Sequence, residues 1–232
     1  MRNVMKAIVW KEYMSLRHRA KKLVFSVLFA VLYLVVFGII KVIQIQNTPQ
    51  MQSIIENIIL YVCVTTGYLI LISLLRFSQE KTQKTLESLL CLPVNPTIIL
   101  LSKCFAAVLL CVMISFFESI ILHIIFILLS GAIFVSLKII VCNLFICALL
   151  YLTFSIINGY ITWCMNATYV KLMSYITALT FIGLVSSFLY IISFPFYMIF
   201  LTFLGIGIIL LILAIFFLRK VDKEKIVLNL QD

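Results

Sequence analysis

Long apolar runs alternate with short polar segments along most of this chain. The runs cover residues 23–40, 57–75, 104–137, 139–165, 172–192 and 196–218. Five of them have the length of a single membrane-spanning helix, since about 20 helical residues cross a hydrocarbon core of about 30 Å. A backbone in lipid must satisfy its own hydrogen bonds, and no alternating strand pattern is present, so the runs predict transmembrane helices.

The run over 104–137 is too long for one simple span. We expect a long third helix that starts near Pro96 and ends about Ser130-Gly131, followed by a short apolar outer loop. The predicted fold is therefore an all-α integral membrane protein with six transmembrane helices. It forms a single domain over residues 1–232.

Composition supports the membrane class. Hydrophobic residues make up 65% of the chain and charged residues 11%, against about 25% charged residues in a typical soluble domain. The mean hydropathy is +1.25. The seven cysteines include no CxxC pair, so we interpret them as packing residues and expect no metal site.

Basic residues predict the orientation, because they resist translocation and stay on the cytoplasmic side. With the amino terminus inside, 16 of the 18 Lys and Arg residues are cytoplasmic and only Lys41 and Lys138 are outside. Both termini are then cytoplasmic, and we expect a multi-pass protein of the bacterial plasma membrane. The net charge of +10 forms an inner collar that suits anionic membrane lipids. Because these charges follow the membrane edges, a nucleic-acid partner is not expected.

Residues 1–22 predict an amphipathic helix in the inner membrane interface. Apolar residues recur there at helical spacing, namely Met5, Val9, Tyr13, Leu16 and Ala20. Trp10 is the expected anchor in the membrane interface. An irregular basic leader is the alternative.

A polar segment, RFSQEKTQKTLESLLCLPVNP, separates the second and third runs. Ser78 can cap a helix with Glu80 in its first turn, and Pro93 should end that helix near Cys91. Asn95-Pro96 can start the next helix as its cap and first-turn residue. The loop over 77–96 therefore predicts a short cytoplasmic helix, a tight bend and then a span. A plain connecting loop with a solvated charged face is the alternative.

The order EKTQKTLESLLCLPVNPTIILLSK, from Glu80 to Lys103, resembles the signature of type-2 ATP-binding-cassette (ABC) exporter permeases. The resemblance implies that the helix at 79–91 is a coupling helix that sits in a cleft of a cytoplasmic ATPase subunit. The coupling residues that it implies are Glu80, Lys81, Thr85, Leu86, Glu87, Leu89, Leu90 and Pro93. The leader, with Trp10, Lys11 and Glu12, is then the interfacial helix beside it, and the tail at 219–232 is cytoplasmic.

The same resemblance implies a transport subunit that exports an amphipathic or lipophilic substrate, such as a peptide toxin, a bacteriocin, an antibiotic or a lipid-like molecule. The chain has no GxxxxGK[ST] loop, so we expect no enzyme activity and no directly bound cofactor. ATP and Mg²⁺ would belong to the partner ATPase. A second permease copy or a paralogue should complete the transporter. The sequence leaves open whether Leu86, Leu89 and Leu90 anchor in the ATPase or pack against neighbouring helix ends.

Two features of the third span are candidates for function. Small residues recur at every fourth position, namely Ala107, Cys111, Ser115 and Ser119. They could pack against a second subunit or within one subunit. Glu118 lies inside the span, where a charge costs at least about 2.5 to 3.5 kcal/mol. It could line the transport pathway and attract a cationic substrate, or form a structural hydrogen bond.

Two other classes compete with the exporter. An ion-coupled secondary transporter would usually carry several charged or polar groups inside its spans, where this chain offers one glutamate. A non-transport polytopic protein, such as an intramembrane protease, would need paired catalytic residues, and His123 with Glu118 does not form such a set.

Overall fold

The computed structural model describes Trp10, Val36 and residues 51–75, 77–82, 85–91, 94–130, 137–165 and 194–228. These residues form helices and no strands: α3 (Met51–Leu74), α4 (Phe77–Thr82), α5 (Thr85–Leu90), α6 (Pro96–Ser130), α7 (Leu137–Cys164), α9 (Phe196–Arg219) and α10 (Lys223–Leu228). The predicted spans at 23–40 and 172–192 lie outside the described residues, except for Val36, which is helical. Lys11 and Glu12 of the predicted interfacial helix lie outside them too, whereas Trp10 is helical and exposed.

Four of the described helices are long and apolar enough to cross a membrane, namely α3, α6, α7 and α9. The prediction of an all-helical membrane protein is confirmed to this extent, and the count of six stays a prediction. The limits of α6 agree with those expected from Pro96 and Ser130. At 1.5 Å per residue its 35 residues extend roughly 50 Å, which exceeds the thickness of the hydrocarbon core.

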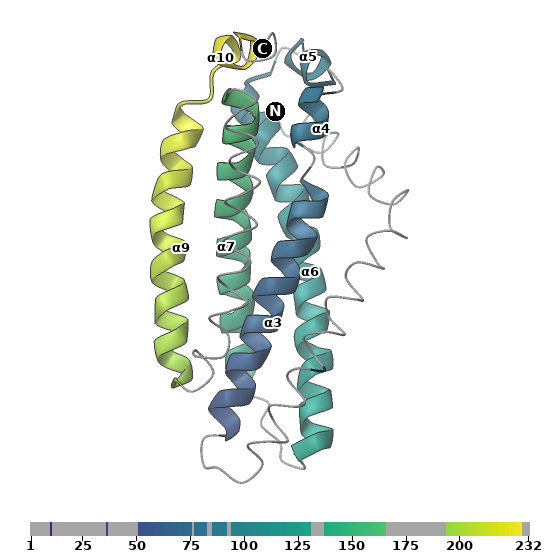
Figure 1. Cartoon of the computed structure of the whole chain (residues 1–232), viewed down its shortest axis with the longest axis vertical. Coiled ribbons are helices and arrows are strands. Elements are labelled where there is room, and N and C mark those ends of the chain that lie inside the picture. Colours follow the sequence, from purple (N-terminus) through teal and green to yellow (C-terminus); the bar gives the residue numbers. More distant parts are fainter. Residues whose placement is uncertain are drawn as a thin grey trace.

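The four long helices form a bundle around α3 (Figure 1). Helix α3 packs against α6, α7 and α9, and it is buried along almost its whole length. Helix α9 packs mainly on α7 and exposes most of its apolar surface, as expected for a helix at the lipid boundary. Helices α3, α7 and α9 run in one direction and α6 runs in the other (Figure 1).

Helix α3 begins at Met51, six residues before the apolar run that predicted it. Its first turns carry polar side chains that find partners. The Gln52 amide donates to Glu56 Oε1 over 3.0 Å, and the Asn57 amide donates to the Phe194 carbonyl oxygen over 2.7 Å. Because these groups are paired, the helix continues through residues that hydropathy alone would leave outside the span.

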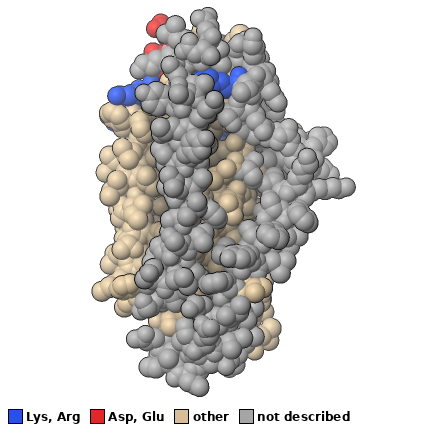
Figure 2. All heavy atoms as spheres, in the orientation of Figure 1, with Lys and Arg blue, Asp and Glu red and all other residues tan. Residues whose placement is uncertain are grey.

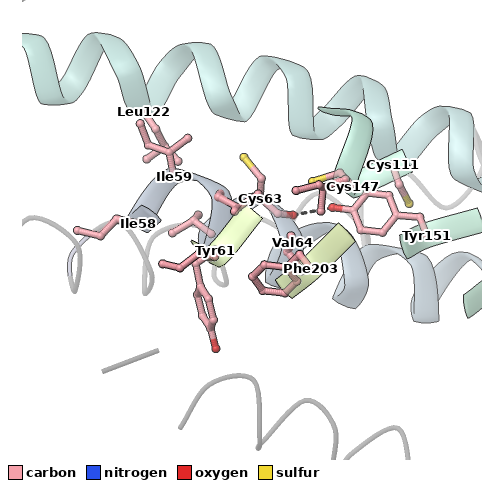
Figure 3. Packing of buried hydrophobic residues seen from close by; sticks show 14 of the residues in the cluster. Ile58, Ile59, Tyr61, Cys63, Val64, Cys111, Leu122, Cys147, Tyr151 and Phe203 are labelled. Carbon is pink, nitrogen blue, oxygen red and sulfur yellow. Dashed lines mark hydrogen bonds between the residues drawn. The ribbon is translucent and has the colours of Figure 1, made fainter. Parts of the chain in front are cut away.

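The core between the long helices is closely packed around Tyr151 of α7. Its hydroxyl donates to the Cys63 carbonyl oxygen of α3 over 2.6 Å, and Figure 3 shows the ring pointing at that backbone. Gly67 makes room for the ring, since an added Cβ would lie only 1.8 Å from the tyrosine oxygen. The fit fixes α7 against α3 within the bundle.

Helices α4, α5 and α10 lie together at one end of the bundle, called the basic end below (Figure 1). Every described Lys and Arg except Lys138 belongs to these helices or to the adjoining ends of α6 and α9. Figure 2 shows their atoms near this end. Lys138 lies in the first turn of α7, at the opposite end. This distribution is the one expected if the basic end faces the cytoplasm.

The helix expected over 79–91 is described in two parts, α4 and α5, and residues 83 and 84 between them lie outside the described residues. One sequence prediction at the basic end needs correction, because Ser78 is the second residue of α4 rather than the cap before it. Phe77, the first residue of α4, is buried against α7, which accounts for the earlier start. The tail at 219–232 contains α10, which the pattern did not predict.

The predicted orientation can be tested with Cys91, the only exposed cysteine of the seven. A membrane-impermeant maleimide should label it in inverted membrane vesicles and leave it unlabelled in intact cells, because α5 would face the cytoplasm. Cys91→Ser should lose the label. In that background Phe194→Cys, an exposed position at the opposite end, should label from outside. Labelling of Cys91 in intact cells would reverse the orientation.

Candidate coupling surface and buried carboxyl group

Helix α4 is held on the end of α7 by aromatic packing. Phe77 meets Trp163 edge to face, with ring centroids 5.5 Å apart, and both side chains are buried. Gly159 allows this approach, since a Cβ there would lie 3.0 Å from the Phe77 ring and 2.5 Å from Leu100. The segment between α3 and α6 therefore packs against the end of α7, in addition to its covalent connections to α3 and α6.

An ion pair ties α4 to α6. Glu80 Oε1 accepts a hydrogen bond from Lys103 Nζ, and both side chains are largely shielded from solvent. Removing one partner of a buried ion pair typically costs about 3 to 5 kcal/mol, because the other charge remains buried. The first residue of the predicted coupling set and the lysine that ends the family-like signature are thus in direct contact.

Lys81 links α4 to the end of α7. Its ammonium group donates to the Met165 carbonyl oxygen over 2.8 Å, just beyond the last residue of α7. A cation at a helix carboxyl end is favoured, because the last carbonyl groups lack helical partners and carry partial negative charge. Glu80 and Lys81 therefore attach α4 to two different spans.

Helix α5 is anchored by Leu86, which is fully buried. Leu86 belongs to the same apolar cluster as Ile99, Leu100 and Trp163, at the ends of α6 and α7. Leu90 packs against this cluster and Leu89 is half-buried. Of the two alternatives for Leu86, packing against neighbouring helix ends is the one that the structure shows.

The remaining predicted coupling residues are only partly described. Thr85 and Glu87 lie in α5, with side chains outside the described set, and Pro93 lies outside it entirely. After the bend, Asn95 caps α6 as predicted: its Oδ1 accepts from the Thr97 backbone N–H over 3.1 Å and from the Thr97 hydroxyl over 2.8 Å. Pro96 is the first residue of α6.

The small-residue stripe of α6 faces the interior of this chain. Its four residues are all buried, namely Ala107, Cys111, Ser115 and Ser119. Helix α6 packs there against α3 and α7. Ser115 Oγ lies 3.0 Å from the Tyr151 hydroxyl, and its carbonyl oxygen accepts a weak hydrogen bond from the Cys63 thiol over 3.7 Å. The stripe therefore packs within the subunit, and the alternative of a contact with a second subunit is not what the structure shows.

Glu118 is buried between α6 and α3, with 6% of its surface exposed. The Thr66 hydroxyl donates to Glu118 Oε2 over 2.6 Å, and the same hydroxyl lies 2.8 Å from the Val62 carbonyl oxygen. One hydroxyl proton cannot serve both acceptors fully. A protonated Glu118 that donates to the Thr66 oxygen would leave the Thr66 proton for Val62, so the site suits a neutral carboxyl group.

The second oxygen of Glu118, Oε1, and the neighbouring Ser119 Oγ are buried without hydrogen-bond partners among the described residues. His123, one turn further along α6, bonds through Nδ1 to the Ser119 carbonyl oxygen over 2.7 Å. Within the described ranges no three His, Cys, Asp or Glu side chains gather as a metal site would require. Of the hydrogen bonds made by Thr66, Glu118 and His123, the one between Thr66 and Glu118 joins two helices, α3 and α6.

Comparison with protein-family models, with curated proteins and with solved structures gives no match to this chain.

Sequence reasoning missed several residues that build these sites. Thr66, Phe77 and Trp163 carry no motif, and only their partners in space reveal their roles. Lys223 and Ile226 lie in a tail that hydropathy gave no reason to fold, although Asp222 is a typical helix-capping residue just before α10.

The neutral hydrogen bond of Glu118 can be tested by a double-mutant cycle. Glu118→Gln should change the free energy of unfolding little, because an amide is neutral and can still bond to Thr66. Thr66→Val keeps the shape and removes the hydroxyl. Glu118→Met removes the carboxyl group, and its coupling energy with Thr66→Val should be about 0.6 kcal/mol, the mean for hydrogen bonds between membrane helices, and at most about 1.7 kcal/mol. Glu118→Gln with Thr66→Val should show a smaller coupling energy, because the amide keeps a bond to Thr66. Thermal unfolding in one detergent is the measurement.

The same variants separate a structural role from a pathway role. A Glu118→Gln protein that unfolds like the wild type but loses all export would place Glu118 in the transport pathway instead.

Proposed function

We propose that this chain is the permease subunit of an ATP-driven exporter of the type-2 ABC kind, and that α4 and α5 together receive force from a separate ATPase. The observation that carries the proposal is the seating of α4 and α5 on the ends of the spans. Leu86 is fully buried against those ends and Glu80 pairs with Lys103 of α6. A connecting loop with a solvated face needs neither contact.

The seating supports a lever that acts on several spans at once. Helix α4 follows α3 after a short link, and α5 leads to α6 through the bend before Asn95. The Glu80–Lys103 pair adds a second attachment to α6, and the bond from Lys81 to Met165 adds one to α7. A push on α5 would therefore tilt α3, α6 and α7 together, because the attached helix ends cannot move independently.

The proposed partners come from the family resemblance at Glu80 to Lys103 and from the lack of a GxxxxGK[ST] loop in the sequence. The partner ATPase subunits would bind ATP and Mg²⁺ and would contact the solvent side of α5, next to the exposed Cys91. A second permease copy or a paralogue would complete the pathway. The exported substrate is amphipathic or lipophilic in this proposal. The exposed apolar side chains of α9, such as Leu201, Ile209 and Ile212, suit contact with membrane lipid.

Charge reversal at the Glu80–Lys103 pair tests the lever. The tagged protein is isolated from membranes of its own host, and the ATPase that copurifies is assayed for ATP hydrolysis and for export in vesicles. Glu80→Lys and Lys103→Glu should each reduce ATP-dependent export strongly, because each places two like charges in a shielded site. The double reversal, Glu80→Lys with Lys103→Glu, should restore a substantial part of it.

Matched controls carry the same charge changes at exposed positions of the basic end. Arg219→Glu and Glu224→Lys should leave export near the wild-type level. Absence of any copurifying ATPase, or export that continues in vesicles without ATP, would contradict the proposed function. Equal effects of the buried and the exposed reversals would instead contradict the role of the Glu80–Lys103 pair.

A further inference from the structure

The carboxyl-terminal helix α10 is built into the basic end through one apolar residue. Ile226 is fully buried, although its neighbours Asp222, Glu224 and Val227 are exposed. Ile226 belongs to the same cluster as Leu86, the anchor of α5. A six-residue helix has too little apolar surface to fold alone, so burial of Ile226 is what holds α10 in place.

A hydrogen bond joins α10 to the end of α5. Lys223 Nζ donates to the Leu90 carbonyl oxygen over 3.5 Å, and Leu90 is the last residue of α5. Asp222 orders the start of α10, because its Oδ1 accepts from the Glu224 backbone N–H over 3.4 Å and its carbonyl oxygen accepts from the Ile226 backbone N–H over 3.2 Å. Lys223 is therefore presented to α5 by an ordered turn.

The connection from α9 to α10 is short and folded. The Lys220 backbone N–H donates to the Phe217 carbonyl oxygen over 2.9 Å, and the Lys220 ammonium group lies 4.2 Å from the centre of the Phe216 ring. Phe217 stacks on Tyr160 of α7 with ring centroids 4.7 Å apart. The end of α9 is thus ordered, and Phe217, Leu218 and Val221 pack against the cluster that contains Ile226 of α10.

We propose that α10 is a positioning element that fixes α5 in its seat and links α5 to the last span, α9. The link matters because α9 packs mainly on α7 and is not among the helices in closest contact with α4 and α5. With α10 in place, a movement of α5 reaches α9 as well as α3, α6 and α7. The transmission part rests on the proposed function above, whereas the positioning part does not.

The native Cys91 gives a direct readout of α5. A nitroxide spin label on Cys91, in the full-length protein purified in detergent, should show restricted motion. Ile226→Asp should release α5 and increase the motion of the label, because a carboxylate would not stay in the apolar cluster. The control Val227→Asp makes the same chemical change at the adjacent exposed position and should leave the spectrum unchanged.

Two milder variants keep the test decisive if Ile226→Asp does not fold. Ile226→Ala and Lys223→Met should each give an intermediate increase in label motion, since the first weakens the apolar anchor and the second removes the donor to Leu90. Unchanged label motion in these folded variants would overturn the positioning role. Equal increases in Ile226→Asp and Val227→Asp would overturn it too, because the effect would then be one of added charge.

The transmission part is tested in the complex with the copurified ATPase. Ile226→Asp should retain the ATPase but export several-fold less substrate for each ATP hydrolysed, whereas Val227→Asp should match the wild type. A wild-type ratio in Ile226→Asp, with the label mobile, would contradict transmission through α10. If no ATPase copurifies with any variant, the proposed function fails, and the label spectra still decide whether α10 positions α5.

Discussion

The burial of Leu86 is the constraint on which the basic end depends. The segment between α3 and α6 is too short to bury an apolar core of its own, so it must share one with the ends of the spans. Leu86 enters the cluster that contains Trp163 and Ile226, and this joins α5 to α7 and α10. Full burial of a leucine side chain contributes about 1.5 to 3 kcal/mol, which is large for a helix of six residues.

The polar contacts of the basic end act chiefly on geometry. A buried ion pair such as Glu80–Lys103 contributes little net stability once the loss of hydration is counted. Removing only one of the two charged side chains is costly, because the other charge stays buried without its partner. The pair therefore favours one register of α4 on α6. The bonds from Lys81 to Met165 and from Lys223 to Leu90 act in the same way at the ends of α7 and α5. Three lysines thus fix the orientation of helices that apolar packing alone would hold less specifically.

Sequence patterns predicted the parts of this fold that local chemistry determines. The apolar content of α7 and α9 predicted their limits closely, and the Asn95-Pro96 and Ser130-Gly131 pairs predicted those of α6, because caps and hydropathy act over a few residues. The early start of α3 depends on a partner more than 100 positions away, the Phe194 carbonyl oxygen bonded by Asn57. The burial of Ile226 and the bond between Thr66 and Glu118 likewise depend on contacts between distant segments. The family resemblance at Glu80 to Lys103 stays a prediction from sequence.

Hydrogen exchange of the backbone amides over residues 77–90 tests the central claim most directly. If α4 and α5 are seated on the span ends, their helical amides should be protected in the intact protein. Ile226→Asp should reduce that protection, and Val227→Asp should leave it unchanged. Exchange over 77–90 as fast as in an unstructured peptide, beside a protected start of α6, would show that the segment is a solvated loop and would contradict the account.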